Sequence, residues 1–149
     1  MENEATRAIP MRARATFGTE FARAPAGQRP VVWSIAGSDT GAGAGLQADL
    51  KALQAFGVHG CTAVAAITAQ NSVAVTRVEP VSAELLDAQL ATLAQDMPPQ
   101  AIKTGLLGSV DNLRVVCRWV DRLRADGHAV ALVVDPVLGS TTGTHFVDD

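Results

Sequence analysis

Four glycines between residues 37 and 45 mark the stretch of the chain best suited to hold a ligand. Gly37, Gly41, Gly43 and Gly45 lie between an apolar run and a helical pattern. Glycine has no Cβ and tolerates positive φ, so the backbone there can approach a ligand closely. The N-terminus of the following helix would add unpaired N–H groups and a favourable dipole. The stretch is therefore either a ligand-binding loop or a flexible connection between a strand and a helix.

Two common phosphate-binding fingerprints do not fit this stretch. A P-loop requires Lys and then Ser or Thr directly after its last glycine, and Leu46 and Gln47 occupy those positions. The glycines follow a Gly-x-Gly-x-Gly spacing instead of the Gly-x-Gly-x-x-Gly of dinucleotide-binding folds, and no carboxylate closes a second strand about 20 residues later. The sequence excludes a P-loop and supports a dinucleotide site only weakly.

Three polar residues elsewhere could act on a ligand. Gln70 follows an apolar run, and its amide carries both a donor and an acceptor, which could pair with the edge of a ligand or simply with loop backbone. Asp49 falls in the first turn of a predicted helix, where it would complement the helix dipole. Asp135 ends a predicted strand and could hold Mg²⁺ or a phosphate-side water, or form an Asp-Pro turn.

Other reactive side chains are predicted to be structural. Lys103 is interpreted as a surface or structural charge, and Cys61 and Cys117 as inert core thiols. The histidines, at positions 59, 128 and 145, lack the spacing of metal ligands.

The elements that position these residues alternate between strand and helix. Predicted strands cover residues 31–36, 61–68, 101–104 and 130–134, with a short edge strand at 73–79; predicted helices cover 46–56, 82–96 and 109–126. Leu46, Leu50 and Leu53 are expected to form the apolar stripe of the first helix. The last helix is expected to bury Val110, Leu113, Cys117, Val120 and Leu123. This alternation is typical of a parallel α/β sheet, in which ligands bind beyond the carboxyl ends of the strands.

Composition narrows the class of protein. The chain has 149 residues, of which 48% are hydrophobic, and a net charge of −3, which argues against nucleic-acid and membrane partners. No apolar run approaches the roughly 18 residues of a membrane helix. Two cysteines suggest no disulfide framework and fit a cytoplasmic protein. Residues 1–30 are expected to form a disordered tail, followed by one domain over residues 31–149.

Several separated motifs, in order, resemble one family. They are Gly37-Ser38-Asp39, residues 43–49, Gly60-Cys61, residues 68–72, residues 103–107 and residues 133–137. Together they resemble the hydroxymethylpyrimidine/phosphomethylpyrimidine kinases of thiamine biosynthesis, in the ribokinase-like superfamily, from Val31 to about Gly143. The resemblance implies a three-layer αβα fold with a mostly parallel sheet, truncated on its C-terminal side.

The resemblance also implies an activity and a site. The expected reaction is ATP-dependent phosphorylation of 4-amino-5-hydroxymethyl-2-methylpyrimidine and of its monophosphate, with Mg²⁺. Gln70 would read the ring, and Asp135 would lie on the Mg²⁺ and phosphate side. The rest of the substrate pocket would comprise Gly37, Ala44, Asp49, Thr68, Leu106 and Val137. Thr68 and Leu106 depart from the Val and Met more common at these positions. The full-length protein would be a homodimer.

The family's later motifs have no counterpart in these 149 residues. They are an Asn/Pro/Glu motif near the nucleotide and a Gly-rich anion hole with a catalytic Cys. The chain is therefore expected to be a fragment that holds the acceptor, is inactive alone and tends to aggregate through an unpaired sheet edge. The alternatives are a pyridoxal-type kinase of the same superfamily, a non-catalytic pyrimidine-binding domain and, more distantly, a dinucleotide oxidoreductase.

Overall fold

The computed structural model describes residues 28–137. The predicted tail up to residue 27, His145 and the end of the proposed domain from residue 138 lie outside the described range. The elements are β1 (Val31–Ser38), α1 (Gly45–Ala55), β2 (His59–Gln70), β3 (Val75–Pro80), α2 (Ala83–Asp96), β4 (Ala101–Thr104), α3 (Val110–Ala125) and β5 (Ala131–Val134). All eight predicted elements are present, and each bound lies within two residues of its predicted position; β2, for example, extends from His59 to Gln70.

The five strands form one sheet in the order β3-β2-β1-β4-β5. β1 lies in the centre and pairs in parallel with β2 and β4, and β4 pairs in parallel with β5. Only the edge strand β3 is antiparallel. The predicted mostly parallel sheet is confirmed, and the carboxyl ends of β1, β2, β4 and β5 consequently meet at one edge.

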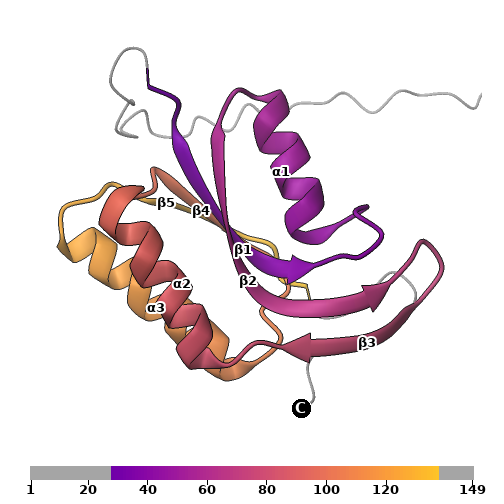
Figure 1. The fold of residues 1–149 in the computed structure, drawn as a ribbon. Coiled ribbons are helices and arrows are strands. Elements are labelled where there is room, and N and C mark those ends of the chain that lie inside the picture. The colour runs from indigo at the N-terminus through magenta and orange to yellow at the C-terminus, as the bar shows by residue number, and fades with distance from the viewer. Residues whose placement is uncertain (1–27, 138–149) are drawn as a thin grey trace, which may run out of the picture.

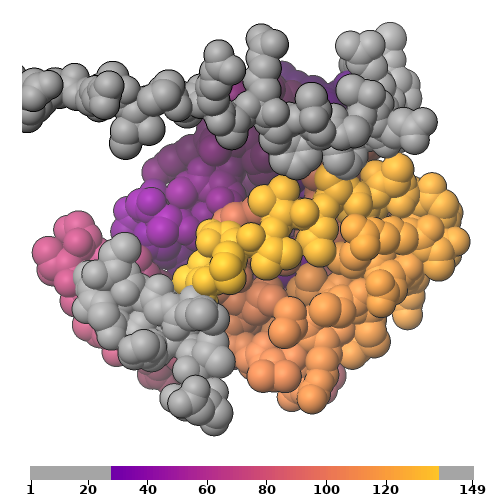
Figure 2. Space-filling model, turned by 180° about the vertical axis from the view of Figure 1, so that it is seen from behind, coloured from indigo at the N-terminus to yellow at the C-terminus, as the bar shows by residue number. Residues whose placement is uncertain are grey.

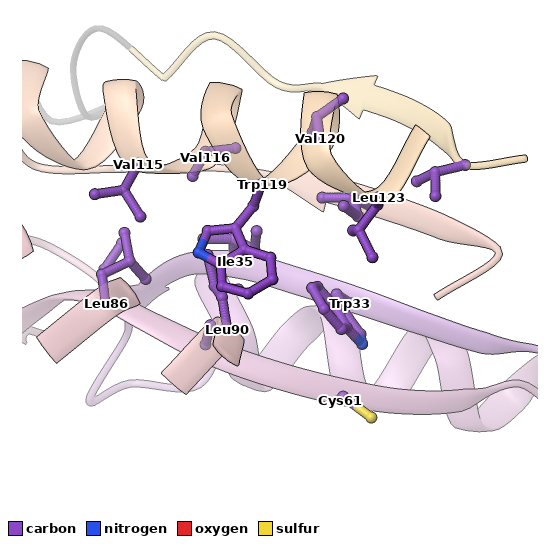
Figure 3. Close-up of a cluster of buried hydrophobic side chains, with 14 residues drawn as sticks. Trp33, Ile35, Cys61, Leu86, Leu90, Val115, Val116, Trp119, Val120 and Leu123 are labelled. Carbon is purple, nitrogen blue, oxygen red and sulfur yellow. The ribbon is translucent and has the colours of Figure 1, made fainter. Parts of the chain in front are cut away.

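Helices cover both faces of the sheet. Figure 1 shows α1 on one face and α2 and α3 side by side on the other. The main core lies between the sheet and the α2–α3 layer, and Figure 3 shows Trp33, Leu86 and Leu90 within it. These three side chains, Ile35 and Ile102 have no exposed surface. Full burial of one such aliphatic side chain contributes about 1.5–3 kcal/mol, so this layer dominates the stability of the described fold.

Helix ends follow the signals in the sequence. Ser82 and Ser109 cap α2 and α3, and their side chains accept hydrogen bonds from the N–H groups of Leu85 and Asn112. Gly57 and Gly127 follow α1 and α3 with φ of 70° and 88°, which the left-handed C-terminal turn of a helix favours. These local rules therefore set where the helices begin and end.

The predicted buried face of α3 is wrong in part. Val110 and Leu113 are 56% and 48% exposed, and Cys117 is exposed. The face that contacts the core instead carries Asn112, Val115, Val116, Trp119, Val120 and Leu123. Asn112 fixes this rotation, because its Nδ2, which carries two protons, lies 2.9 Å from the carbonyl oxygen of Leu107 and 3.2 Å from those of Ala65 and Val81.

The first helix also buries less than predicted. Leu46 is buried, whereas Leu50 is 40% exposed. α1 is the only described helix on its face of the sheet, so the outer part of its stripe has no neighbouring helix to pack against.

β5, the strand at the edge of the sheet opposite β3, presents apolar side chains to solvent. Leu132, Val133 and Val134 of β5 are 38%, 57% and 62% exposed, and Figure 2 shows this segment in yellow at the surface. This exposure is the feature that underlies the predicted tendency to aggregate, which stays a prediction. No helix within residues 28–137 has the length and apolar character needed to cross a membrane.

Candidate substrate pocket

A cavity of about 240 Å³ opens at the carboxyl ends of the parallel strands. We call it the strand-end pocket. Seven of the eight predicted site residues line it: Gly37, Ala44, Thr68, Gln70, Leu106, Asp135 and Val137. Gly37 and Gln70, from two different strands, thus border the same space. The eighth, Asp49, lies outside the lining.

A larger hollow of about 470 Å³ lies along the β2–β3 hairpin and is lined by Ile67, Thr76, Arg77 and Glu79, among others. It is more open to solvent and is formed mainly by one hairpin. The strand-end pocket gathers residues from several strand ends, which is where ligands bind in open α/β sheets, so it is the better candidate for a substrate site.

Gln70 is a polar side chain of the pocket that keeps both a donor and an acceptor for a ligand. It ends β2, where a register shift follows Ala69, and it is half-buried. The Thr68 hydroxyl donates to the Ser38 carbonyl at 3.0 Å and lies 3.4 Å from Oε1 of Gln70, so its single proton serves the shorter bond. No residue in the described range accepts from Nε2 of Gln70. Donor and acceptor are therefore both available to a ligand.

The glycine loop is organised from within by Asp39, which is 5% exposed. Its Oδ1 accepts from the Gly41 N–H at 2.8 Å, and its Oδ2 accepts from the N–H groups of Gly43 and Ala44 at 3.0 and 2.9 Å. These three loop amides are thus already paired, and the loop forms a wall of the pocket. This role of Asp39 was not predicted, although an Asp followed by glycines two and four residues later is a sequence signal of a turn closed by the Asp side chain.

Gly45 brings the start of α1 against the end of β1. Its φ is 56°, and a Cβ at this position would lie 2.3 Å from the carbonyl oxygen of Gly37. Any side chain would therefore separate Gly37 from Ala44, the two backbone walls on this side of the pocket.

Asp49 acts behind the pocket instead of lining it. It is the fifth residue of α1, beyond the first turn, so the predicted interaction with the helix dipole is wrong. Its Oδ2 accepts from the Ser34 hydroxyl at 2.5 Å, and its two oxygens lie 3.1 and 3.0 Å from Nζ of Lys103. Asp49 therefore ties α1 to β1 and β4.

Lys103 reaches from β4 into the pocket lining. Its side chain is 25% exposed, and Nζ lies 3.7 Å from Oδ2 of Asp135. A Cβ at Gly105 would lie 3.3 Å from Nζ, so the absence of a side chain there leaves room for the ammonium group. The prediction of a structural charge is correct as far as the Asp49 pair goes, but it missed the place of Lys103 at the pocket.

Asp135 is the most accessible carboxylate at the pocket, with its side chain 55% exposed. Its N–H donates to the Thr104 carbonyl at 3.1 Å, which fixes the backbone just after β5. Residues 28–137 contain no group of three or more His, Cys, Asp and Glu that could hold a metal ion. A single carboxylate still suits Mg²⁺, which proteins often bind through one or two carboxylates together with substrate phosphates.

The two cysteines differ in environment. Cys61 is buried in the core with its Sγ 3.8 Å from Sδ of Met97, and burial raises the pKa of its thiol. It is a core thiol, as predicted. Cys117 lies exposed on α3, contrary to its predicted place in the core.

Comparison with known proteins identifies the family. A family model described as phosphomethylpyrimidine kinase matches residues 39–149. The chain belongs to this family. A hydroxymethylpyrimidine/phosphomethylpyrimidine kinase of Synechococcus elongatus is 40% identical over 119 residues, which are 80% of this chain and 43% of the relative. One of Rhizobium meliloti is 44% identical over 76% of this chain and 41% of its own length. The chain spans less than half the length of these curated relatives.

Solved structures agree with this placement. The phosphomethylpyrimidine kinase of Clostridium difficile 630 matches with a TM-score of 0.69 and 36% identity over 80% of this chain and 50% of that one. The pyridoxal kinase of Staphylococcus aureus in complex with AMP-PCP and pyridoxal matches with a TM-score of 0.64 and 35% identity over 74% and 40%. The α/β, ribokinase-like fold and the resemblance to the pyrimidine kinases are thereby confirmed.

Proposed function

We propose that the protein phosphorylates 4-amino-5-hydroxymethyl-2-methylpyrimidine and its monophosphate with ATP, in thiamine diphosphate biosynthesis, and that this chain carries the acceptor site. The observation that supports it is the shared pocket of Gly37 and Gln70, which the fold builds from separate strands. Family membership supplies the substrate class, because the relatives are named as kinases of this pyrimidine and its phosphate.

The chemistry of Gln70 suits an aminopyrimidine. Its Oε1 would accept from the exocyclic amine while its Nε2 donates to the adjacent ring nitrogen. Within residues 28–137, Oε1 has only the long 3.4 Å contact with the Thr68 hydroxyl, and Nε2 has no acceptor. Leu106 and Val137 would pack against the ring, and the backbone at Gly37 and Ala44 would close the other side. A pocket of about 240 Å³ is small, as a single-ring acceptor requires.

ATP and Mg²⁺ complete the proposal. Solved neighbours of this chain are pyridoxal kinases in complex with AMP-PCP or ADP. When bound, Mg²⁺ neutralises charge on the transferred phosphoryl group, and Asp135 is the described residue that would hold it. The described residues position the acceptor, whereas the loop amides that could have cradled a triphosphate are bound to Asp39. We therefore expect this chain to bind the acceptor without turnover.

We further propose that the full-length protein acts in the cytoplasm as a homodimer, with small molecules and no nucleic acid or membrane as partners. The net charge of −3 and the two free cysteines support the choice of partners and compartment. The dimer rests on the family resemblance.

A pyridoxal-type kinase is the second candidate, because the solved pyridoxal kinases match this chain almost as well as the pyrimidine kinase does. Pyridoxal lacks the exocyclic amine that Oε1 of Gln70 would accept from. Melting of the 149-residue chain with each compound separates the two: we expect the pyrimidine to raise Tm and pyridoxal to raise it less. The opposite order would favour the pyridoxal assignment.

Turnover is tested on the full-length protein. With ATP and Mg²⁺ it should phosphorylate the pyrimidine, and the 149-residue chain should not. Pyrimidine binding without turnover at full length would instead indicate a non-catalytic binding domain. Robust turnover by the 149-residue chain would contradict the expectation that it is inactive alone.

A further inference from the structure

We propose that Lys103 binds the phosphate group of the phosphorylated acceptor and so sets the affinity of the pocket for the second substrate, the pyrimidine monophosphate. This inference rests on the proposed function, in which one pocket takes first a neutral alcohol and then its phosphate ester. The ester carries about −1.5 to −2 charge near pH 7, and the alcohol carries none. A residue that acts on this difference must present a positive group to the pocket.

Lys103 is the sole Lys or Arg among the described residues that line the strand-end pocket. Backbone N–H groups of a glycine-rich loop can also bind phosphate, but three of those in this loop already have an acceptor. Gly41, Gly43 and Ala44 donate to Asp39, which is 5% exposed and held in place. Within the described range, the side chain of Lys103 therefore remains the positive group available to an acceptor phosphate.

The position of Nζ suits this role. The side chain starts on β4 and reaches the pocket over Gly105, where a Cβ would come within 3.3 Å of Nζ. Asp49 holds the ammonium group through both carboxylate oxygens, at 3.0 and 3.1 Å. An ammonium group has three donors, so the pair with Asp49 fixes its position and leaves a donor for a ligand.

The carboxylates around Nζ of Lys103 determine the conditions under which the phosphate group can bind. Asp49 and Asp135 both face it, Asp135 at a longer 3.7 Å with its side chain 55% exposed. Two carboxylates beside one ammonium group repel a dianion. A divalent cation at the accessible Asp135 would remove this repulsion, so binding of the ester is measured with Mg²⁺ present.

Calorimetric titration of the 149-residue chain with the alcohol and with its phosphate ester, both with Mg²⁺, tests the inference. We expect K103M to weaken binding of the ester about tenfold or more, and binding of the alcohol less than about twofold, because one charge-assisted hydrogen bond is lost. K103R should keep part of the preference. R114M removes a positive charge from an exposed pair on α3 and should change neither affinity.

A double variant separates an effect on ligand binding from an effect on folding. K103M alone leaves Asp49, whose side chain is 20% exposed, without its ion-pair partner. D49N/K103M removes both charges and should show the same selective loss. Equal loss of both ligands, or no loss, in the folded double variant would overturn the role of Lys103 and leave the pyrimidine site standing. Failure of the wild-type chain to bind either ligand would overturn the proposed site, and this inference with it.

Discussion

Asp49 of α1 and Lys103 of β4 form an ion pair across the sheet face that α1 covers, with 3.0 Å between Oδ2 and Nζ. Ser34, which is paired with Lys103 in the sheet, donates to the same carboxylate. The start of α1 supplies one wall of the strand-end pocket, and the segments after β4 and β5 supply another. The pair therefore holds two walls of the pocket at a fixed separation.

The energetic link between Asp49 and Lys103 is measurable by a double-mutant cycle. Because both side chains are three-quarters or more buried, we expect D49N and K103M to show a coupling of about 1–2 kcal/mol in urea unfolding, between the values for surface and buried pairs. A cycle of D49N with R114M, which lies in another ion pair, should show none. Additive effects of D49N and K103M would contradict the structural role of the pair.

Replacement of Asp39 should destabilise the protein more than replacement of a loop residue usually does. D39A leaves the N–H groups of Gly41, Gly43 and Ala44 without their acceptor, and we expect a loss of about 2–4 kcal/mol in the free energy of unfolding. D111A is the matched control, since Asp111 is an exposed carboxylate that pairs with Arg114, and it should cost about 1 kcal/mol or less. Similar losses in the two variants would show that the loop does not depend on Asp39.

Two glycines with positive φ should respond very differently to alanine. At Gly45 a Cβ would lie 2.3 Å from the Gly37 carbonyl oxygen, whereas at Gly57 no atom lies within 4 Å. G57A should therefore cost only the left-handed backbone penalty, about 1–2 kcal/mol. G45A adds a steric clash of about 1–3 kcal/mol and should also weaken ligand binding at the pocket. Equal Tm values for the two variants would contradict the close approach of α1 to β1.

The two thiols should react at different rates with a disulfide reagent such as DTNB. Cys117 is exposed and should be modified rapidly in the native protein. Cys61 is buried and its pKa is raised, so it carries less thiolate at any given pH and should react only as the fold opens. The C117S variant isolates the slow phase, which denaturant should accelerate. Fast modification of C117S in the native state would place Cys61 outside the core.

Much of the fold was predictable because its signals are local. Alternating strand and helix patterns, Ser caps and C-terminal glycines identified every element, and the parallel topology then brings Gly37, Gln70 and Asp135 to one edge of the sheet. These residues lie far apart in the chain, yet the rule that places ligands beyond the carboxyl ends of the strands needs only the identity of the strands.

What the sequence could not provide depends on distant contacts. The rotation of α3 is set by the buried Asn112, whose side chain donates to a carbonyl 47 residues away. In the sequence alone, the stripe through Val110 and Leu113 is equally apolar, so the buried face could not be chosen from it. Likewise, Lys103 and Asp49 are 54 residues apart, and nothing local distinguishes a lysine that lies over Gly105 from one on the surface.

The affinity of the 149-residue chain for 4-amino-5-hydroxymethyl-2-methylpyrimidine, with and without the Gln70 amide, tests the central claim most directly. By calorimetry, the wild-type chain should bind the compound, and Q70L should bind it about 10- to 100-fold more weakly, because the ring edge loses its hydrogen-bonding partner. Q95L, at an exposed position near the end of α2, should bind like the wild type. Unchanged affinity in a folded Q70L variant would contradict the assignment of the strand-end pocket as a pyrimidine site.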